Sequence, residues 1–219
     1  LGKYGDFVMQ TENVVGEIQA ALKRIGKADN TLFVFTSDNG CSKAAGIGDL
    51  ARKGHVVSAH LRGSKADLWD GGHRIPFIVK WPGKVKPGSQ SNQLICLTDL
   101  FATVSEVLGA ELPKGSAEDS VSFFPALSGK PIVSTRNGVI HHSISGHFAY
   151  RQGQWKLLLA RASGGWTSPK ENQAKGALPA QLYDMEADVG EKKNLYREKP
   201  EVVAELLSLL EKDVKRGRS

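Results

Sequence analysis

The sequence predicts an α/β domain followed by a smaller α+β domain with an antiparallel sheet and a C-terminal helix. In the first part of the chain, an amphipathic helical pattern leads through a short polar turn into an unbroken apolar run, an order typical of α/β proteins. Toward the C-terminus, short strand patterns precede one long amphipathic helix. A Pro-, Gly- and Ser-containing stretch over residues 111–130 separates the two patterns. We therefore expect one domain over residues 1–134 and a second over residues 135–219.

The first domain begins with a predicted helix. Its apolar positions recur at the spacing of one helix face, with Thr11 as the expected N-cap and Gly26 as the expected end. These positions are Val14, Val15, Ile18, Ala21, Leu22 and Ile25. Residues 31–36 then form a short run of apolar and β-branched side chains, which predicts a strand buried on both faces of a parallel sheet.

Three more elements are predicted before the change of domain. Residues 75–81 indicate a second buried strand, closed by a Pro-Gly turn, and residues 93–97 a short third strand. Thr98 is the expected N-cap of a helix that ends at Gly109. Its predicted apolar face consists of Leu100, Phe101, Val104, Val107 and Leu108.

The second domain contains four strand candidates and a helix. The strands are expected at residues 139–145, 147–151, 155–160 and 181–185, with a tight turn at residues 152–154. The helix is expected to open near Pro200, because proline suits the first helical turn. One face of it carries Val203, Leu206, Leu207, Leu210 and Val214.

Composition narrows the functional classes. Of the 219 residues, 40% are hydrophobic and 24% charged, which is ordinary for a soluble globular protein and excludes disorder or a coiled coil. The net charge of +6 allows an acidic substrate but does not indicate nucleic acid as a partner. Cys41 and Cys96 provide neither a disulfide framework nor metal-site spacing. No apolar run reaches the length of a membrane span.

Two segments carry residues suited to chemistry. Asp38 and Asn39 follow the first strand, where ligands bind in open α/β sheets, and their oxygens suit Ca²⁺ or Mg²⁺ better than zinc. Asp-Asn-Gly is also a common turn sequence, and on this motif alone the turn is the favoured interpretation. The second segment, residues 61–76, places Arg62, Lys65 and other donors among glycines, which fits an anion site or a solvated surface loop equally well.

Several motifs in this order resemble the type I sulfatase family, arylsulfatases included. They are FTSDNG at residues 35–40, LRGSK at 61–65 and WDGGHRIPFIVKWPG at 69–83. Residues 151–158 and 182–195 are similar to the C-terminal subdomain of that family. The resemblance covers nearly the whole chain, and it implies an alkaline-phosphatase-like α/β fold and hydrolysis of sulfate esters.

The resemblance also implies roles for individual residues. Asp38 and Asn39 match the pair that binds Ca²⁺ in the family, with Mg²⁺ the less favoured ion. Lys65 matches the catalytic lysine that contacts the substrate sulfate. His60, His73 and Arg74 are expected to line the substrate pocket, with Arg74 mainly shaping it, although no family motif assigns the two histidines a catalytic role. A bound cation and an ammonium group together suit the negative charge of a sulfate ester.

One family feature is absent from the chain. Sulfatases use a formylglycine made from Cys or Ser in a Cys/Ser-x-Pro/Ala-x-Arg motif, and no such motif occurs in the 219 residues. We therefore expect the chain to be the C-terminal portion of a longer enzyme and to be inactive alone. The missing N-terminal part of that enzyme is expected to carry the formylglycine and to be the partner of this portion. The expected substrate is a sulfated glycan or an aryl sulfate, and the family resemblance favours a periplasmic or secreted enzyme.

Two alternatives remain at this point. The first is a phosphodiester or phosphonate monoester hydrolase on the same scaffold, and the second is a non-catalytic module that binds sulfated glycans.

A truncated catalytic domain is also expected to expose the edges of its core and to associate with other copies.

Overall fold

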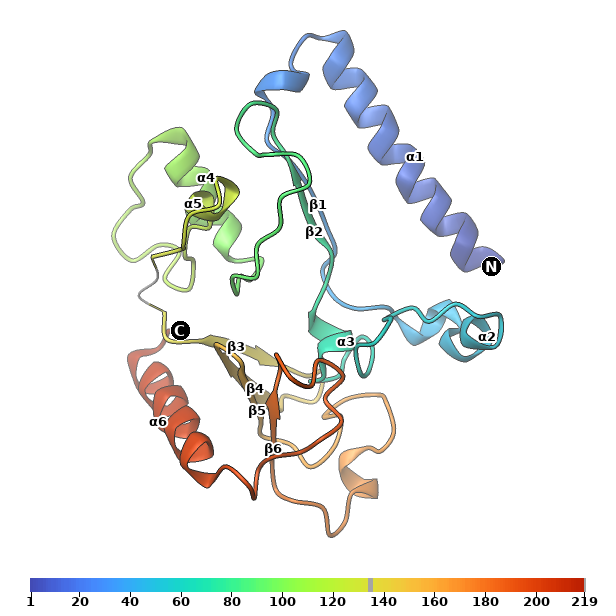
Figure 1. The fold of residues 1–219 in the computed structure, drawn as a ribbon, viewed down its shortest axis with the longest axis vertical. Coiled ribbons are helices and arrows are strands. Elements are labelled where there is room, and N and C mark those ends of the chain that lie inside the picture. Colours follow the sequence, from blue (N-terminus) through green and yellow to red (C-terminus); the bar gives the residue numbers. More distant parts are fainter. Residues whose placement is uncertain (134–135, 219) are drawn as a thin grey trace.

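The computed structural model describes residues 1–133 and 136–218 of the chain (Figure 1). The helices are α1 (Lys3–Arg24), α2 (Ile47–Arg52), α3 (Asp70–His73), α4 (Asp99–Leu108), α5 (Phe124–Leu127) and α6 (Pro200–Arg216). The strands are β1 (Phe33–Thr36), β2 (Phe77–Lys80), β3 (Val139–His142), β4 (Phe148–Gln152), β5 (Trp155–Leu158) and β6 (Gln181–Asp184). Short 3₁₀ turns cover Ala28–Asn30, Lys43–Ala45 and Glu171–Gln173. The predicted domain boundary at residues 134 and 135 lies outside the described residues.

Strands β1 and β2 form a two-stranded antiparallel pair. Phe33 lies opposite Lys80 and Thr36 opposite Phe77. Both predicted strands are present, but the parallel direction expected for them is wrong. A short apolar run is compatible with either direction, so the sequence pattern could not decide between them. The strands are also less buried than expected: every residue of β1 is half-buried, and β2 alternates between half-buried and exposed positions.

Helix α1 starts eight residues before its predicted cap. Thr11 lies inside the helix, where its hydroxyl donates a hydrogen bond to the Phe7 carbonyl at 3.0 Å. The predicted end is confirmed, because Gly26 has a φ of +65° and the Lys27 N–H donates to the Leu22 carbonyl at 2.9 Å. No residue of α1 is buried. Of its apolar stripe, Val14, Ile18 and Ile25 are exposed and the others are half-buried.

Helix α4 has the predicted bounds, and Gly109 ends it in the left-handed conformation. Thr98 does not cap it, because its own backbone is helical and its side chain makes no capping bond. The Asp99 carboxylate instead accepts the N–H groups of Cys96 and Val121. Residues 93–97 form no strand.

The second half contains the predicted antiparallel sheet, in the order β3-β4-β5-β6. One face packs against α6 through a cluster of Tyr150, Leu157, Ala180, Leu182, Val203, Leu206 and Leu210. The other face packs against a segment from the first half, in a cluster of Leu68, Trp69, Ala149, Leu158, Ala160, Tyr183 and Met185. The core of the molecule is therefore centred on this sheet, and residues 68–69 are part of it. Figure 1 shows α3, which directly follows that segment, beside the upper end of the sheet.

Within the described part of the chain, no helix combines the length and hydropathy that a membrane crossing needs.

Candidate functional site

Three motifs of the predicted site are interlocked through their backbones. The Gly40 N–H donates to the Gly72 carbonyl at 3.0 Å, and the Lys65 N–H donates to the Cys41 carbonyl at 2.9 Å. Gly71 closes the set, since its N–H bonds the Arg62 carbonyl at 2.7 Å. The structure therefore brings the loop after β1, the Lys65 loop and the glycine pair of α3 into one assembly.

Glycine is required where these segments cross. A Cβ on Gly40 would lie 1.8 Å from the Gly71 carbonyl oxygen, and one on Gly71 would lie 2.3 Å from the Gly63 oxygen. A Cβ on Gly72 would lie 2.5 Å from the Asp67 oxygen. Such approaches are shorter than any real van der Waals contact, so only glycine allows them. The glycines of the motifs thus determine how the loops pack.

Asp38 and Asn39 directly follow β1. The Asp38 side chain is exposed and Asn39 is half-buried, while the Ser37 hydroxyl donates to the Asn39 carbonyl at 2.9 Å. A carboxylate and a carboxamide in adjacent positions are suitable oxygen ligands for Ca²⁺. The described residues contain no cluster of three or more His, Cys, Asp or Glu side chains able to hold a metal. Asp38 and Asn39 can thus supply only part of a Ca²⁺ coordination sphere. The metal site remains a prediction.

Lys65 lies in a tight turn over residues 64–67. The Asp67 N–H donates to the Ser64 carbonyl at 3.1 Å, and the Ser64 N–H donates back to the Asp67 carboxylate at 2.8 Å. Ser64 and Asp67 are buried, whereas Lys65 between them is half-buried. The backbone on either side of Lys65 is thus fixed, while its side chain keeps access to solvent.

A buried ionic cluster anchors the start of α3. Lys156 of β5 donates to the Asp70 carboxylate at 2.6 Å and to the Glu191 carboxylate at 2.8 Å. Glu191 also accepts the Asp70 N–H at 2.6 Å. Burial raises the pKa of Glu191, and the charge of Lys156 opposes that shift. The cluster joins the glycine-rich segment of the first half to the C-terminal sheet.

Arg62 faces inward and does not extend into an anion site. Its guanidinium lies 3.7 Å from the ring centroid of Trp69 and donates to the Glu191 carbonyl at 2.7 Å. A second bond, at 3.2 Å, reaches the Tyr183 hydroxyl. Of the cationic residues considered for the anion site, Arg62 therefore has a structural role.

His73 packs against His141, with 4.2 Å between ring centroids. Burial, reinforced by the nearby charge of Lys156, lowers the pKa of His73 to about 4. The pKa of His141 is also lowered, mainly by burial, and its Nε2 donates to the Leu68 carbonyl at 3.3 Å. Both imidazoles are therefore neutral at pH 7. The Nε2 atom of His73 is buried without a hydrogen-bond partner among the described residues.

The other two predicted pocket residues lie at the surface. His60 is exposed, and its carbonyl oxygen faces the loop that carries Gly190. Arg74 is also exposed, and its N–H donates to the Asp70 carbonyl at 2.7 Å at the end of α3. The assignment of His60, His73 and Arg74 to a substrate pocket remains a prediction.

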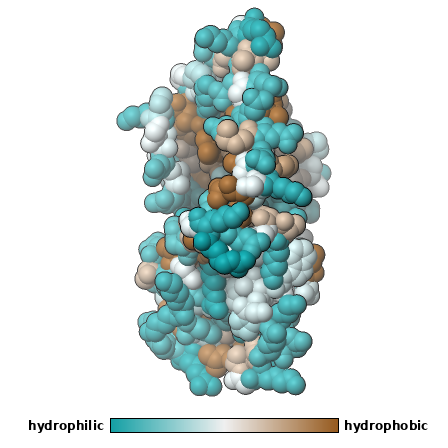
Figure 2. Space-filling model, turned by 90° about the vertical axis from the view of Figure 1, so that its right-hand side faces the viewer, coloured by the Kyte–Doolittle hydropathy of each residue, from teal (hydrophilic) through white to brown (hydrophobic). Residues whose placement is uncertain are grey.

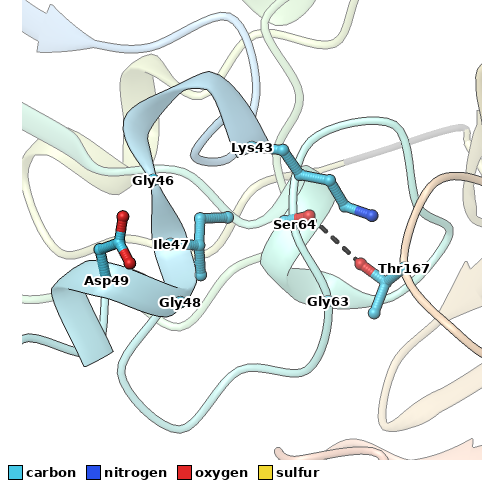
Figure 3. A pocket seen from close by; sticks show the side chains of 8 residues that line it. All are labelled: Lys43, Gly46, Ile47, Gly48, Asp49, Gly63, Ser64 and Thr167. Carbon is cyan, nitrogen blue, oxygen red and sulfur yellow. Dashed lines mark hydrogen bonds between the residues drawn. The ribbon is translucent and has the colours of Figure 1, made fainter. Parts of the chain in front are cut away.

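A cavity of about 460 Å³ lies beside the Lys65 turn (Figure 3). Gly63 and Ser64 form one side of it, and the Ser64 hydroxyl meets that of Thr167 at 3.2 Å. Figure 3 shows the Lys43 side chain extending toward Thr167. The remaining lining residues are Gly46, Ile47, Gly48 and Asp49. The cavity thus combines residues of both halves of the chain next to Lys65.

Sequence reasoning did not single out the residues that hold these loops. Lys156 had a readable signal, because it is a charged residue within an otherwise apolar strand, where a buried partner is needed. Asp70 and Glu191 had none, since their partners are distant in the sequence, and the same holds for the Asp67 contacts with Trp166 and Thr167. Only the fold reveals them.

Comparison with known families identifies the chain. A family model described as sulfatase matches residues 1–110, and a model described as N-sulphoglucosamine sulphohydrolase, C-terminal, matches residues 64–218. The chain belongs to the sulfatase family. The two matches overlap over the Lys65 loop and α3, the region where the two halves of the structure are joined.

Similar proteins share this assignment. The chain is 39% identical over 217 residues to an N-acetylgalactosamine-6-O-sulfatase of Bacteroides thetaiotaomicron, covering 96% of the chain and 42% of that protein. A solved structure from work on the metabolism of multiple glycosaminoglycans by the same organism superposes with a TM-score of 0.79 at 35% identity, over 95% of this chain and 44% of that one.

A third protein, solved in complex with its substrate D-glucosamine-2-N,6-O-disulfate, has a TM-score of 0.70 at 25% identity. It is matched over 95% of this chain and 39% of its own. The chain thus spans about two fifths of the length of these relatives. The alkaline-phosphatase-like fold expected from the sequence is confirmed by these sulfatase structures.

Proposed function

We propose that this chain is part of a sulfuric ester hydrolase that removes sulfate from a 6-O-sulfated amino sugar. The observation that supports the activity most is the interlock of the Asp38–Asn39 loop with the Lys65 turn, in a chain of the sulfatase family. The substrate class is supported by the N-acetylgalactosamine-6-O-sulfatase relative and by the relative bound to a sulfated glucosamine.

In this proposal, Asp38 and Asn39 supply two oxygen ligands to Ca²⁺. Calcium takes about 6 to 8 oxygens, so other ligands come from elsewhere in the parent protein and from the substrate. The bound ion would supply positive charge close to the sulfate oxygens. Asp38 is suited to this role because it is exposed and directly follows β1, in the loop whose Cys41 carbonyl accepts the Lys65 N–H.

Lys65 binds the sulfate in this proposal. Its ammonium group donates hydrogen bonds to sulfate oxygens whose charge changes as the ester bond breaks. A fixed backbone on both sides of Lys65 limits the reorganisation needed during the reaction. His73 is neutral at pH 7 and adds no charge to the site. We place the nucleophile outside this chain, because the sequence lacks the formylglycine motif.

Steady-state kinetics of the parent enzyme on N-acetylgalactosamine 6-sulfate test the role of Lys65. We expect Lys65→Ala to lower kcat/KM by about 100- to 1,000-fold, the cost of removing one donor to a developing oxyanion. Lys80→Ala is the matched control, because Lys80 is an exposed lysine of β2 that bonds Gln19. Equal activity of Lys65→Ala and the wild type would reject the assignment.

Calcium titration of the metal-free parent enzyme tests the metal ligands. We expect Asp38→Ala to lose Ca²⁺ binding in calorimetry, whereas Asp29→Ala, an exposed carboxylate that does not line the cavity, keeps it. An unchanged Ca²⁺ affinity in Asp38→Ala would show that Asp38 is not a ligand.

Turnover of a phosphate diester in preference to the sulfate ester would replace the proposed activity with phosphodiester hydrolysis. Binding of sulfated glycans without hydrolysis would favour a non-catalytic module.

A further inference from the structure

The turn that carries Lys65 has a strained backbone. Ala66 has a φ of +82°, in the region that residues with a Cβ rarely adopt. Such a conformation persists only where the surroundings hold it in place. The contacts around Ala66 therefore decide where the preceding residue, Lys65, points.

The Asp67 carboxylate is the centre of these contacts. The side chain is fully buried, and its two oxygens accept three backbone N–H groups. One comes from Ser64 at 2.8 Å, within the turn, and the others from Trp166 at 2.8 Å and Thr167 at 2.9 Å, about 100 residues later. Bonds from N–H groups to an ionised carboxylate are among the stronger hydrogen bonds in proteins. One side chain thus closes the turn and attaches it to the C-terminal half.

Neighbouring backbone contacts follow the same path. The Ala66 carbonyl accepts the Ile144 N–H at 3.1 Å, and the Leu68 N–H donates to the Ser163 carbonyl at 2.8 Å. A Cβ on Gly165 would lie 2.2 Å from the Ala66 oxygen, so the later loop lies directly against the turn. The C-terminal half therefore forms the support on which the Lys65 turn rests.

We propose that Asp67 is a positioning residue for Lys65 and that the C-terminal half acts on the sulfate site through it. Asp67 holds the strained turn, so that the Lys65 side chain leaves the backbone in one fixed direction. It also holds Thr167, which lines the cavity beside the turn. This inference rests on the proposed function, because it takes Lys65 as the sulfate contact.

A double-mutant cycle in the full-length parent enzyme tests the inference. We expect Asp67→Ala to lower kcat/KM by about 10- to 100-fold, the range typical of residues that hold and orient the groups in direct contact at a site. In a Lys65→Ala background, the same change should have no further effect, since the group that Asp67 positions is gone. Multiplicative losses would show a general structural role and overturn the inference.

Asp67→Asn serves if Asp67→Ala does not fold. The amide keeps the shape but offers one acceptor oxygen, so we expect an intermediate loss of kcat/KM and the same lack of effect without Lys65. Asp184→Ala is the matched control, because the Asp184 carboxylate also accepts two backbone N–H groups, from Glu186 and Ala187, away from the turn. A loss in Asp184→Ala equal to that in Asp67→Ala would contradict a specific role.

Hydrogen exchange of the same full-length variants separates this inference from the proposed function. Asp67→Ala should increase exchange in peptides over residues 64–68 and 163–167, and Asp184→Ala should not. If the wild type does not hydrolyse sulfate esters, the proposed function fails, and the exchange data still test the anchoring of the turn. Unchanged exchange in both peptides would overturn the inference even in an active enzyme.

Discussion

Helices α4 and α6 have similar amphipathic sequences but opposite orientations toward the protein interior. Helix α6 buries its apolar face, including Leu206 and Leu210, against the C-terminal sheet. Helix α4 buries Asp99 and Thr103, while Phe101 and Leu108 on its apolar face are 59% and 73% exposed. An amphipathic pattern thus identifies the apolar face of a helix but not whether the same chain covers it.

The contrast extends to the two halves of the molecule. Helix α1 has no buried residue, whereas the sheet β3–β6 is covered on both faces. Figure 2 shows brown, hydrophobic patches on the surface of the upper half, which carries α1, β1 and β2. Exposed apolar surface on this scale is typical of contact regions. The first half is consistent with the expected exposure of core edges, and the second half holds a core of its own.

The largest effect is expected from breaking the buried cluster that joins the halves. Lys156→Met keeps the side-chain volume but leaves Asp70 and Glu191 as neighbouring buried carboxylates. We expect a loss of about 3–5 kcal/mol in the free energy of unfolding, measured by urea denaturation. A stability equal to the wild type would show that the cluster does not hold the halves together.

A matched pair of leucine substitutions compares the helices directly. In this chain, Leu206→Ala in α6 should cost about 2–5 kcal/mol, because Leu206 is fully buried. Leu108→Ala in α4 should change stability by less than about 0.5 kcal/mol, because Leu108 is exposed. A clear loss in the parent protein for Leu108→Ala would show that α4 is covered there, and equal losses in this chain would contradict the comparison.

The pH dependence of stability probes the histidine pair at the junction. Burial lowers the folded-state pKa of His73 to about 4, below the value of about 6.5 in the unfolded chain. Between these values the unfolded state binds more protons, so stability is full above pH 6.5 and falls as the pH drops toward 4. The slope contributed by His73 is at most about 1.4 kcal/mol per pH unit.

His73→Gln removes this contribution and should flatten the dependence in thermal melts between pH 4 and 6.5. His60→Gln is the control for the substitution itself, because His60 is an exposed histidine. Identical slopes in the wild type and His73→Gln would contradict the buried, neutral state of His73.

Among the charged groups, the smallest effect is expected at an exposed ion pair in the well-packed half. Lys193 bonds Glu198 at 2.8 Å, and both side chains are more than half exposed. We expect Lys193→Met to change the free energy of unfolding by less than about 1 kcal/mol. A loss as large as that of Lys156→Met would show that burial is not what distinguishes the two lysines.

Local patterns were sufficient for much of this architecture. The four strands of the second half, the bounds of α4 and the end of α1 near Gly26 were predicted correctly, because each has a period or a terminating residue within a few positions. The glycines of residues 61–76 were interpreted as part of an anion site or a surface loop, whereas Gly71 and Gly72 allow backbone segments to cross.

These local patterns could not predict contacts between segments that are far apart in the sequence. The antiparallel direction of β1 and β2 depends on how the segment between them folds back. Arg62 was considered for an anion site because its inward contact, the carbonyl of Glu191, lies 129 residues later. In the sequence, Asp67 resembles any polar loop residue, because its bond from the Thr167 N–H is visible only in the structure. The candidate metal and sulfate residues came from family resemblance and stay predictions.

The long sequence separation between the Lys65 turn and its anchors has a consequence for biosynthesis. Asp70 leaves the ribosome 121 residues before Glu191. At about 5–20 residues per second, the ribosome takes roughly 6–24 s to synthesise the residues between them. During most of that interval the Leu68 and Trp69 side chains lack the complete sheet that later covers them. A pause in translation within this window prolongs the exposure of an apolar nascent segment, which makes it a natural substrate for chaperones.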